Sequence, residues 1–226
     1  MRAADFAPET QHPLCKREIA LACKQEYNVV IIFLLFVQTL ILVFLLTNYR
    51  RAKTPGGTFF FTVVTHNRRP FLCTDENIVL LRQAFRYVMT HHPFTIDAIV
   101  ILPEHLHCLW TLPIGDADFS TRWRLIKSHF SRHCAILYQG QVSKSRQRKQ
   151  EKAVWQRRFW EHQIRDEDDF IRHVEYIHYN PVRHHLVSAP LEWPHSSFER
   201  YVQAGVYAAD WGTEESVTFP DYVGHE

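Results

Sequence analysis

Apolar and polar residues follow two different patterns along the chain. Residues 29–46 are apolar except for Gln38 and Thr39. A helix of that length, at about 1.5 Å per residue, reaches roughly the thickness of a bilayer core, so this segment is a transmembrane candidate. From Asn48 onward, short apolar runs alternate with amphipathic stretches, which is the pattern of a soluble α+β domain.

Four segments of that domain are predicted to be strands. Residues 59–65 are rich in β-branched and aromatic side chains. Residues 95–102 and 105–112 are joined by the short turn Pro103-Glu104, so they are predicted to pair as a hairpin. Residues 154–164 are aromatic and also strand-like.

Three helices are predicted between and after these strands. Thr74 or Asp75 is a suitable N-cap for the first helix, whose apolar residues then recur on one face. Asp118 or Ser120 caps the second helix, which runs to about Tyr138 and interleaves apolar with basic residues.

The third helix follows a basic segment, residues 139–153, that is predicted to be a mobile loop. This helix starts at Asp166 with an acidic first turn, as the helix dipole favours, and is predicted to end where Pro181 forbids continuation. The order is that of a ferredoxin-like βαββαβ antiparallel sheet with an added C-terminal helix. The predicted domain covers residues 48–203, and residues 204–226 form an acidic tail.

Charge and cysteine content narrow the class of protein. The formal net charge is only +2, so a nucleic-acid role depends on local clustering, and seven basic residues against one acid lie within 139–158. The five cysteines are widely spaced and form no C-x-x-C pair, which argues against a disulfide framework or a zinc knuckle. A reducing cytoplasm fits this composition best.

Two candidate chemical elements stand out. His105 and His107 lie two residues apart on one predicted strand, so their side chains project from the same face and could supply two ligands of a metal site. Ordinary surface histidines can have the same spacing. Tyr176 and Asn180 lie four residues apart on a helix and share a face, where a tyrosine nucleophile would need a nearby cation or base. The alternative is a packed tyrosine, with Asn180 serving as a helix C-cap.

A third element combines cations with aromatic residues. Single-strand binders pair phosphate-neutralising cations with stacking surfaces, and the aromatic side chains here can equally belong to the core. The candidate phosphate contacts are Arg122, Lys127, Arg157 and Arg158.

These elements, in this order, resemble the REP-associated tyrosine transposases, a branch of the HUH single-strand tyrosine transposases. The resemblance covers residues 48–201 and rests on NYRRAKTPGGTFFFTVVTHNRRPFL, VILPEHLHCLW, WRLIKSHFSR, VWQRRFWEHQIRDEDDF, VEYIHYNPVRHHLV and EWPHSSFERYV. It implies that His105, His107 and Asn180 hold Mg²⁺ or Mn²⁺ and that Tyr176 is the nucleophile. Tyr179 is the rival nucleophile, but no amide follows it four residues later.

The resemblance also implies the reaction and its partner. Tyr176 would attack a phosphodiester in single-stranded hairpin DNA and leave a 5′-phosphotyrosine and a free 3′-OH, so no nucleotide cofactor is needed. Tyr49, Arg50 and Arg51 are placed to help read the sequence beside the hairpin. A monomer in the cytoplasm, associated with the nucleoid, is expected.

Residues 1–47 depart from the family pattern, whose members usually begin near the Asn-Tyr-Arg-Arg segment. The favoured hypothesis is a start assigned too far upstream, because a DNA enzyme gains little from a bilayer. The alternative is a membrane anchor in residues 29–46. Three other functions remain open: an inactive nucleic-acid-binding module of the same fold, a membrane-anchored protein with an unrelated role, and a hydrolytic two-histidine metalloenzyme.

Overall fold

The computed structural model describes residues 53–213, 217–220 and 222–224. The predictions for residues 1–47 and for Tyr49, Arg50 and Arg51 lie outside these described residues. Among the helices of the described part, none combines the length and the apolar character that crossing a membrane requires.

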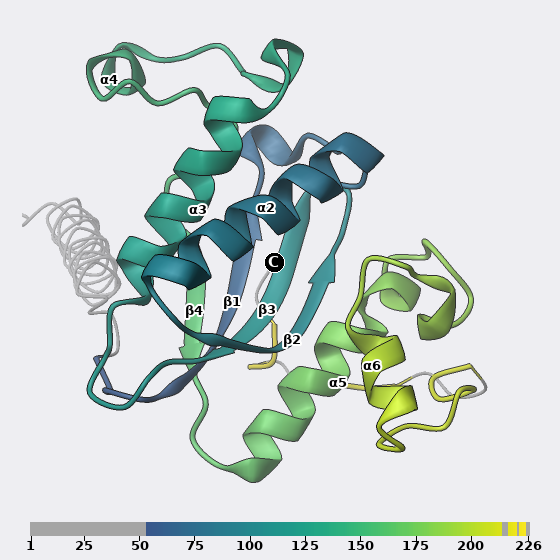
Figure 1. The fold of residues 1–226 in the computed structure, drawn as a ribbon. Helices are drawn as coiled ribbons and strands as arrows, with labels where there is room; N and C mark the ends of the chain where they lie inside the picture. The colour runs from purple at the N-terminus through teal and green to yellow at the C-terminus, as the bar shows by residue number, and fades with distance from the viewer. Residues whose placement is uncertain (1–52, 214–216, 221, 225–226) are drawn as a thin grey trace, which may run out of the picture. The chain divides into compact units, whose positions relative to one another are not determined.

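A four-stranded antiparallel sheet forms the centre of the described domain (Figure 1). The strand order is β2-β3-β1-β4, so β1 and β3 are the central strands and the hairpin of β2 and β3 lies to one side. This order confirms the predicted ferredoxin-like topology. The strands are β1 (Thr58–Val64), β2 (Thr95–Ile101), β3 (His105–Thr111) and β4 (Trp160–Gln163).

The longer helices cover opposite faces of this sheet. Thr74 caps α2 (Asp75–His91) and Asp118 caps α3 (Phe119–His133), each side chain accepting a hydrogen bond from the helix backbone. These two helices lie together across one face (Figure 1). The other face packs against α5 (Glu167–Arg183), which Asp166 caps, and the segment that follows it carries η3 (Pro190–Glu192) and α6 (Phe198–Gln203).

Alternation along the strands assigns each side chain to one of two cores. Phe59 and Phe61 of β1 enter the core under α2 and α3, where Trp123 stacks on Trp110 at a centroid distance of 4.3 Å. Phe60 of β1 enters the core under α5. Because β3 alternates in the same way, its two histidines share one face, as the sequence predicted, and this face is the one that α5 covers.

Three predicted boundaries were wrong. The second helix ends at His133 rather than near Tyr138, because the backbone is extended at Cys134 and resumes only as η2 (Ile136–Tyr138). The basic segment is not all loop, since Ser143 caps the short helix α4 (Lys144–Arg148). The last strand is shorter than residues 154–164: only β4 pairs continuously with β1, and Trp155 makes an isolated bridge.

Pro181 does not end the last helix, contrary to the prediction. α5 continues to Arg183, with Pro181 inside it. Proline removes one backbone donor, and this close to the end of a helix the loss affects a single helical hydrogen bond. The carbonyl groups of Asn180 and Pro181 accept closing bonds from His184 and Leu186. The site residues of α5 therefore stay on one continuous helix.

Candidate active site

The two histidines of β3 point their outer nitrogens at the same place. His105 Nε2 and His107 Nε2 lie 3.1 Å apart, and both side chains are fully buried. Two nitrogens bound to one divalent ion at about 2.1 Å are separated by roughly 3.0–3.4 Å. The spacing of this pair therefore fits a shared metal ion.

Neighbouring polar groups hold the inner nitrogens of the pair. His105 Nδ1 donates to Glu104 Oε1 at 2.8 Å, and this hydrogen bond lowers the pKa of the Glu104 carboxyl. His107 Nδ1 lies 3.0 Å from the hydroxyl of Thr62, its direct partner on β1. A histidine whose Nδ1 carries the proton presents the lone pair of Nε2, which is how metal-binding histidines are usually oriented.

Tyr176 lies beside this pair. Its ring centroid is 5.2 Å from that of His107, and the side chain is only 1% exposed. Arg183 Nη1 donates to Tyr176 Oη at 2.6 Å, and the guanidinium carbon lies 5.2 Å from the ring centroid. The phenol oxygen thus has a cation in direct contact.

Asn180 lies midway in sequence between two residues that contact the histidine pair, Tyr176 in α5 and His184 at its C-cap. One turn earlier, Tyr176 meets His107, and one turn later the ring of His184 lies 5.2 Å from that of His105. Residues four apart share a helix face, so fully buried Asn180 is on the side of α5 that faces the pair. Tyr179, the rival nucleophile, packs instead against Trp211 and Phe219.

The C-terminal segment covers the phenol of Tyr176. Gly224 lies against the ring so closely that an added Cβ would meet Tyr176 Cζ at 1.9 Å, and its carbonyl accepts a 3.4 Å hydrogen bond from Oη. Phe219 packs edge-on at 5.4 Å. The phenol oxygen of Tyr176 is therefore shielded in this conformation, and another molecule can reach it only if these residues move.

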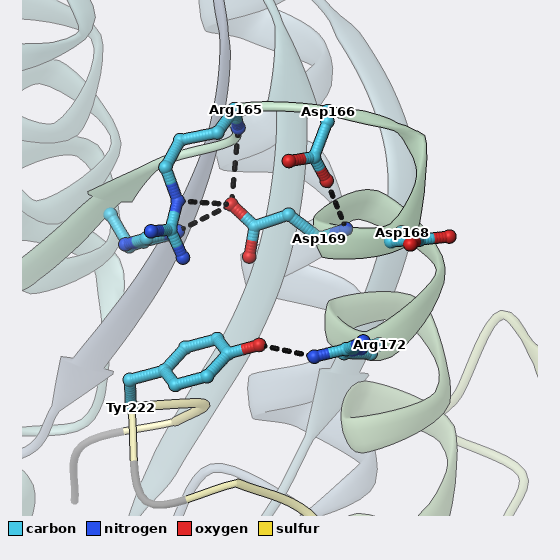
Figure 2. A pocket seen from close by; sticks show the side chains of 7 residues that line it. Arg165, Asp166, Asp168, Asp169, Arg172 and Tyr222 are labelled. Carbon is cyan, nitrogen blue, oxygen red and sulfur yellow. Dashed lines mark hydrogen bonds and ion pairs between the residues drawn. The ribbon is translucent and has the colours of Figure 1, made fainter.

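A second polar cluster lies at the start of α5. His162, Asp169 and His173 place possible ligand atoms within 4.8 Å of one another, beside a pocket of about 520 Å³ (Figure 2). Asp169 Oδ2 accepts from His162 Nε2 and from the backbone and side chain of Arg165, and despite burial these bonds lower the pKa of Asp169 to about 2.

The geometry of this cluster favours a structural role. His173 Nδ1 lies 2.7 Å from the carbonyl of Asp169, so this nitrogen acts as a donor. The rings of His162 and His173 stack nearly parallel, at 14°, so their in-plane lone pairs do not converge on one point. The three residues form a hydrogen-bonded network at the first turns of α5.

The predicted DNA-binding residues fall into two environments. Arg122 is 2% exposed and donates to the carbonyls of His92, Pro93 and Asp118 and to the carboxylate of Asp116, so it holds the start of α3 in place and is a poor phosphate contact. Among the remaining candidates that the structure describes, Lys127, Arg157 and Arg158 lie at the chain segment that leads into β4. Lys127 Nζ donates to the Gln156 carbonyl, Arg157 pairs with Glu151, and Arg158 is exposed.

Four residues that touch the site were absent from the sequence prediction: Thr62, Glu104, Arg183 and Gly224. Glu104 adjoins the histidine pair in sequence, and Arg183 follows Tyr176 by seven residues, two helical turns, so spacing alone could have suggested both. Thr62 and Gly224 reach the site only through strand register and the return of the C-terminal segment. No local signal identifies those two.

The chain is similar to curated relatives and to a solved structure. The chain is 46% identical over 166 residues to the REP-associated tyrosine transposase of Escherichia coli (strain K12), covering 74% of this chain and 91% of the relative. A counterpart from Haemophilus influenzae is 44% identical over 167 residues, covering 74% and 94%. A REP-associated tyrosine transposase solved with a REP hairpin matches with a TM-score of 0.64 and 43% identity, covering 79% of this chain and 98% of that one. No protein-family model matches the chain.

Proposed function

Because the chain belongs to the REP-associated tyrosine transposases, we propose that it cleaves and rejoins single-stranded hairpin DNA through a covalent bond to Tyr176. The observation that carries this proposal is the contact of Tyr176 with His107, whose Nε2 converges with that of His105. A buried phenol beside two metal-ligating nitrogens and a guanidinium is the arrangement that tyrosine attack on a phosphate needs.

In the proposed metal site, His105, His107 and Asn180 hold Mg²⁺ or Mn²⁺. The amide oxygen of Asn180 is a ligand type that such a hard cation favours, and the 3.1 Å spacing of the two Nε2 atoms supports a shared ion. When bound, the ion would polarise the scissile phosphate and stabilise the charge that develops on it. Thr62 and Glu104 keep the two imidazoles in the required orientation.

The proposed reaction is a transesterification. Tyr176 Oη forms a bond to phosphorus, the bond to the 3′-oxygen breaks, and the 5′-phosphotyrosine conserves the bond energy for rejoining. No nucleotide cofactor is required for that reason. The segment that ends at Gly224 has to leave the phenol before DNA binds, because the ring is covered.

Hairpin DNA is the proposed partner because a relative at 43% identity was solved with a REP hairpin. Lys127, Arg157 and Arg158 form a basic surface beside β4 that suits the phosphate backbone. A DNA substrate would place the enzyme with the nucleoid. One chain supplies His107, Tyr176 and Arg183, so we propose that a monomer is sufficient for cleavage.

The test is covalent trapping with the full chain. Labelled single-stranded hairpin DNA from palindromic repeats near the gene is incubated with Mn²⁺ or Mg²⁺ and resolved on a denaturing gel. An adduct that disappears in Tyr176→Phe and in His105→Ala supports the proposal. Cutting without adduct would indicate hydrolysis, and binding without cutting would indicate an inactive DNA-binding module.

A further inference from the structure

Arg183 connects the buried nucleophile to solvent. It lies two helical turns after Tyr176 and therefore on the same side of α5. The side chain of Tyr176 is only 1% exposed, whereas Arg183 is an exposed residue. Its Nη1 lies 2.6 Å from Tyr176 Oη. Once the segment at Gly224 has moved away from the phenol, a substrate that reaches Oη would also meet this guanidinium.

The chemistry of a guanidinium suits more than the phenol. Arginine carries five donors in a planar fork and binds phosphate through two parallel hydrogen bonds. When phosphorus bonds to Oη, its non-bridging oxygens lie next to the atom that Arg183 already contacts. The same fork that donates to Oη can thus bond a phosphate oxygen without a large movement of α5.

We propose that Arg183 is a catalytic residue that binds the scissile phosphate against Tyr176 and neutralises its negative charge during both cleavage and rejoining. This inference rests on the proposed tyrosine mechanism and adds a specific role for one residue to it. Fixed charges aimed at a developing anion are among the largest contributions to catalysis, because they are already oriented when the reaction occurs.

The step balances without further reactants. The Tyr176 Oη–phosphorus bond forms while the phosphorus–O3′ bond breaks, the phenol proton passes to solvent water, and the departing 3′-oxygen takes a proton from water. Rejoining reverses these changes with another 3′-OH. Arg183 contributes hydrogen-bond donors to both steps and takes no part in the proton transfers.

A structural role is the competing explanation. Arg183 lies in the last turn of α5, where a cation interacts favourably with the helix dipole. Its guanidinium also packs over the Tyr176 ring. A substitution that merely loosened α5 would lower thermal stability and DNA binding together with the cleavage rate, so the experiment measures all three.

The experiment uses the full chain with Arg183→Met, which keeps an unbranched side chain but removes the guanidinium, and Arg183→Lys, which keeps the positive charge. The matched control is Arg86→Met, at an exposed position of α2 on the opposite side of the sheet. We expect the single-turnover rate of adduct formation to fall about 100-fold in Arg183→Met. The rate of Arg183→Lys should be within about tenfold of wild type, and that of Arg86→Met should be unchanged. Hairpin affinity, measured by fluorescence anisotropy, should stay within about threefold, and the melting temperature should stay at its wild-type value.

A substrate with a neutral methylphosphonate at the scissile position separates the two roles. If Arg183 neutralises the phosphate, the wild-type advantage over Arg183→Met should shrink from about 100-fold to less than about fivefold on this substrate. An equal defect on both substrates, or equal rates for wild type and Arg183→Met on the natural one, would overturn the inference while the tyrosine mechanism stands. Absence of any adduct in the wild-type protein would overturn both.

Discussion

The two faces of the sheet are built from alternating residues of the same strands, but they bury different chemistry. The face under α2 and α3 is filled by aromatic and aliphatic side chains such as Phe61, Trp110 and Trp123. The face under α5 buries histidines, Thr62 and Asn180 beside a smaller apolar core. One face supplies stability, and the other uses that stability to hold polar groups in a fixed geometry.

The largest expected effect is a loss of cleavage activity, without a loss of stability, on substitution of a histidine on the α5 face. His107→Ala removes one of the two convergent nitrogens, so adduct formation should fall at least about 1,000-fold, close to the assay limit. Thermal unfolding followed by circular dichroism should change little, because the lost ring leaves a site that water can fill. Wild-type cleavage by this variant would disprove the role of the pair.

A substitution on the opposite face of the sheet should lower stability and leave the cleavage rate unchanged. Trp123→Ala removes a fully buried ring stacked on Trp110, so the free energy of unfolding should fall by about 3–5 kcal/mol in urea titrations. The cleavage rate per folded molecule should remain at the wild-type level. Ile126→Val in the same core is a milder control, with an expected loss of about 1 kcal/mol. If Trp123→Ala lowered the rate per folded molecule, the separation between the faces would be disproved.

Asp169 shows where charge contributes stability on the α5 face. Its pKa in the folded protein is about 2, below the ordinary value of 3.8, so its contribution is complete above about pH 4 and is lost as pH falls toward 2. Asp169→Asn should lower the free energy of unfolding near pH 7 by about 2 kcal/mol. That free energy should then change less as the pH falls from about 4 toward 2. Exposed Asp168→Asn on the same turn is the control and should leave the melting temperature unchanged. Identical acid profiles for wild type and Asp169→Asn would contradict this assignment.

The smallest expected effect concerns the orientation of one imidazole. Thr62→Val keeps the shape of the side chain but removes the hydroxyl beside His107 Nδ1, so the Mn²⁺ concentration for half-maximal cleavage should rise about 10- to 100-fold. Thr58→Val, on the same strand and far from the pair, should leave it unaffected. Equal shifts in both variants would show that the hydroxyl of Thr62 does not orient His107.

The sequence predicted what depends on local periodicity. Alternation placed His105 and His107 on one face, and helical spacing placed Tyr176 and Asn180 together, because these relations involve residues only a few positions apart. It failed at Pro181, where burial of α5 against the sheet outweighs one lost hydrogen bond. Arg122 was misjudged for a related reason: composition suggests a solvated cation, whereas tertiary structure supplies buried carbonyls for its guanidinium.

Tyr176 is held by the same helix whose neighbouring residues Val174 and Ile177 complete the core on its face of the sheet. Tyr176, the proposed nucleophile, and the histidine that it contacts therefore come from one polypeptide, and bringing them together requires no encounter between molecules. The expected reaction order follows from this. With DNA in excess, the rate of adduct formation per molecule of enzyme should be independent of enzyme concentration, so a dilution series should leave the specific activity constant.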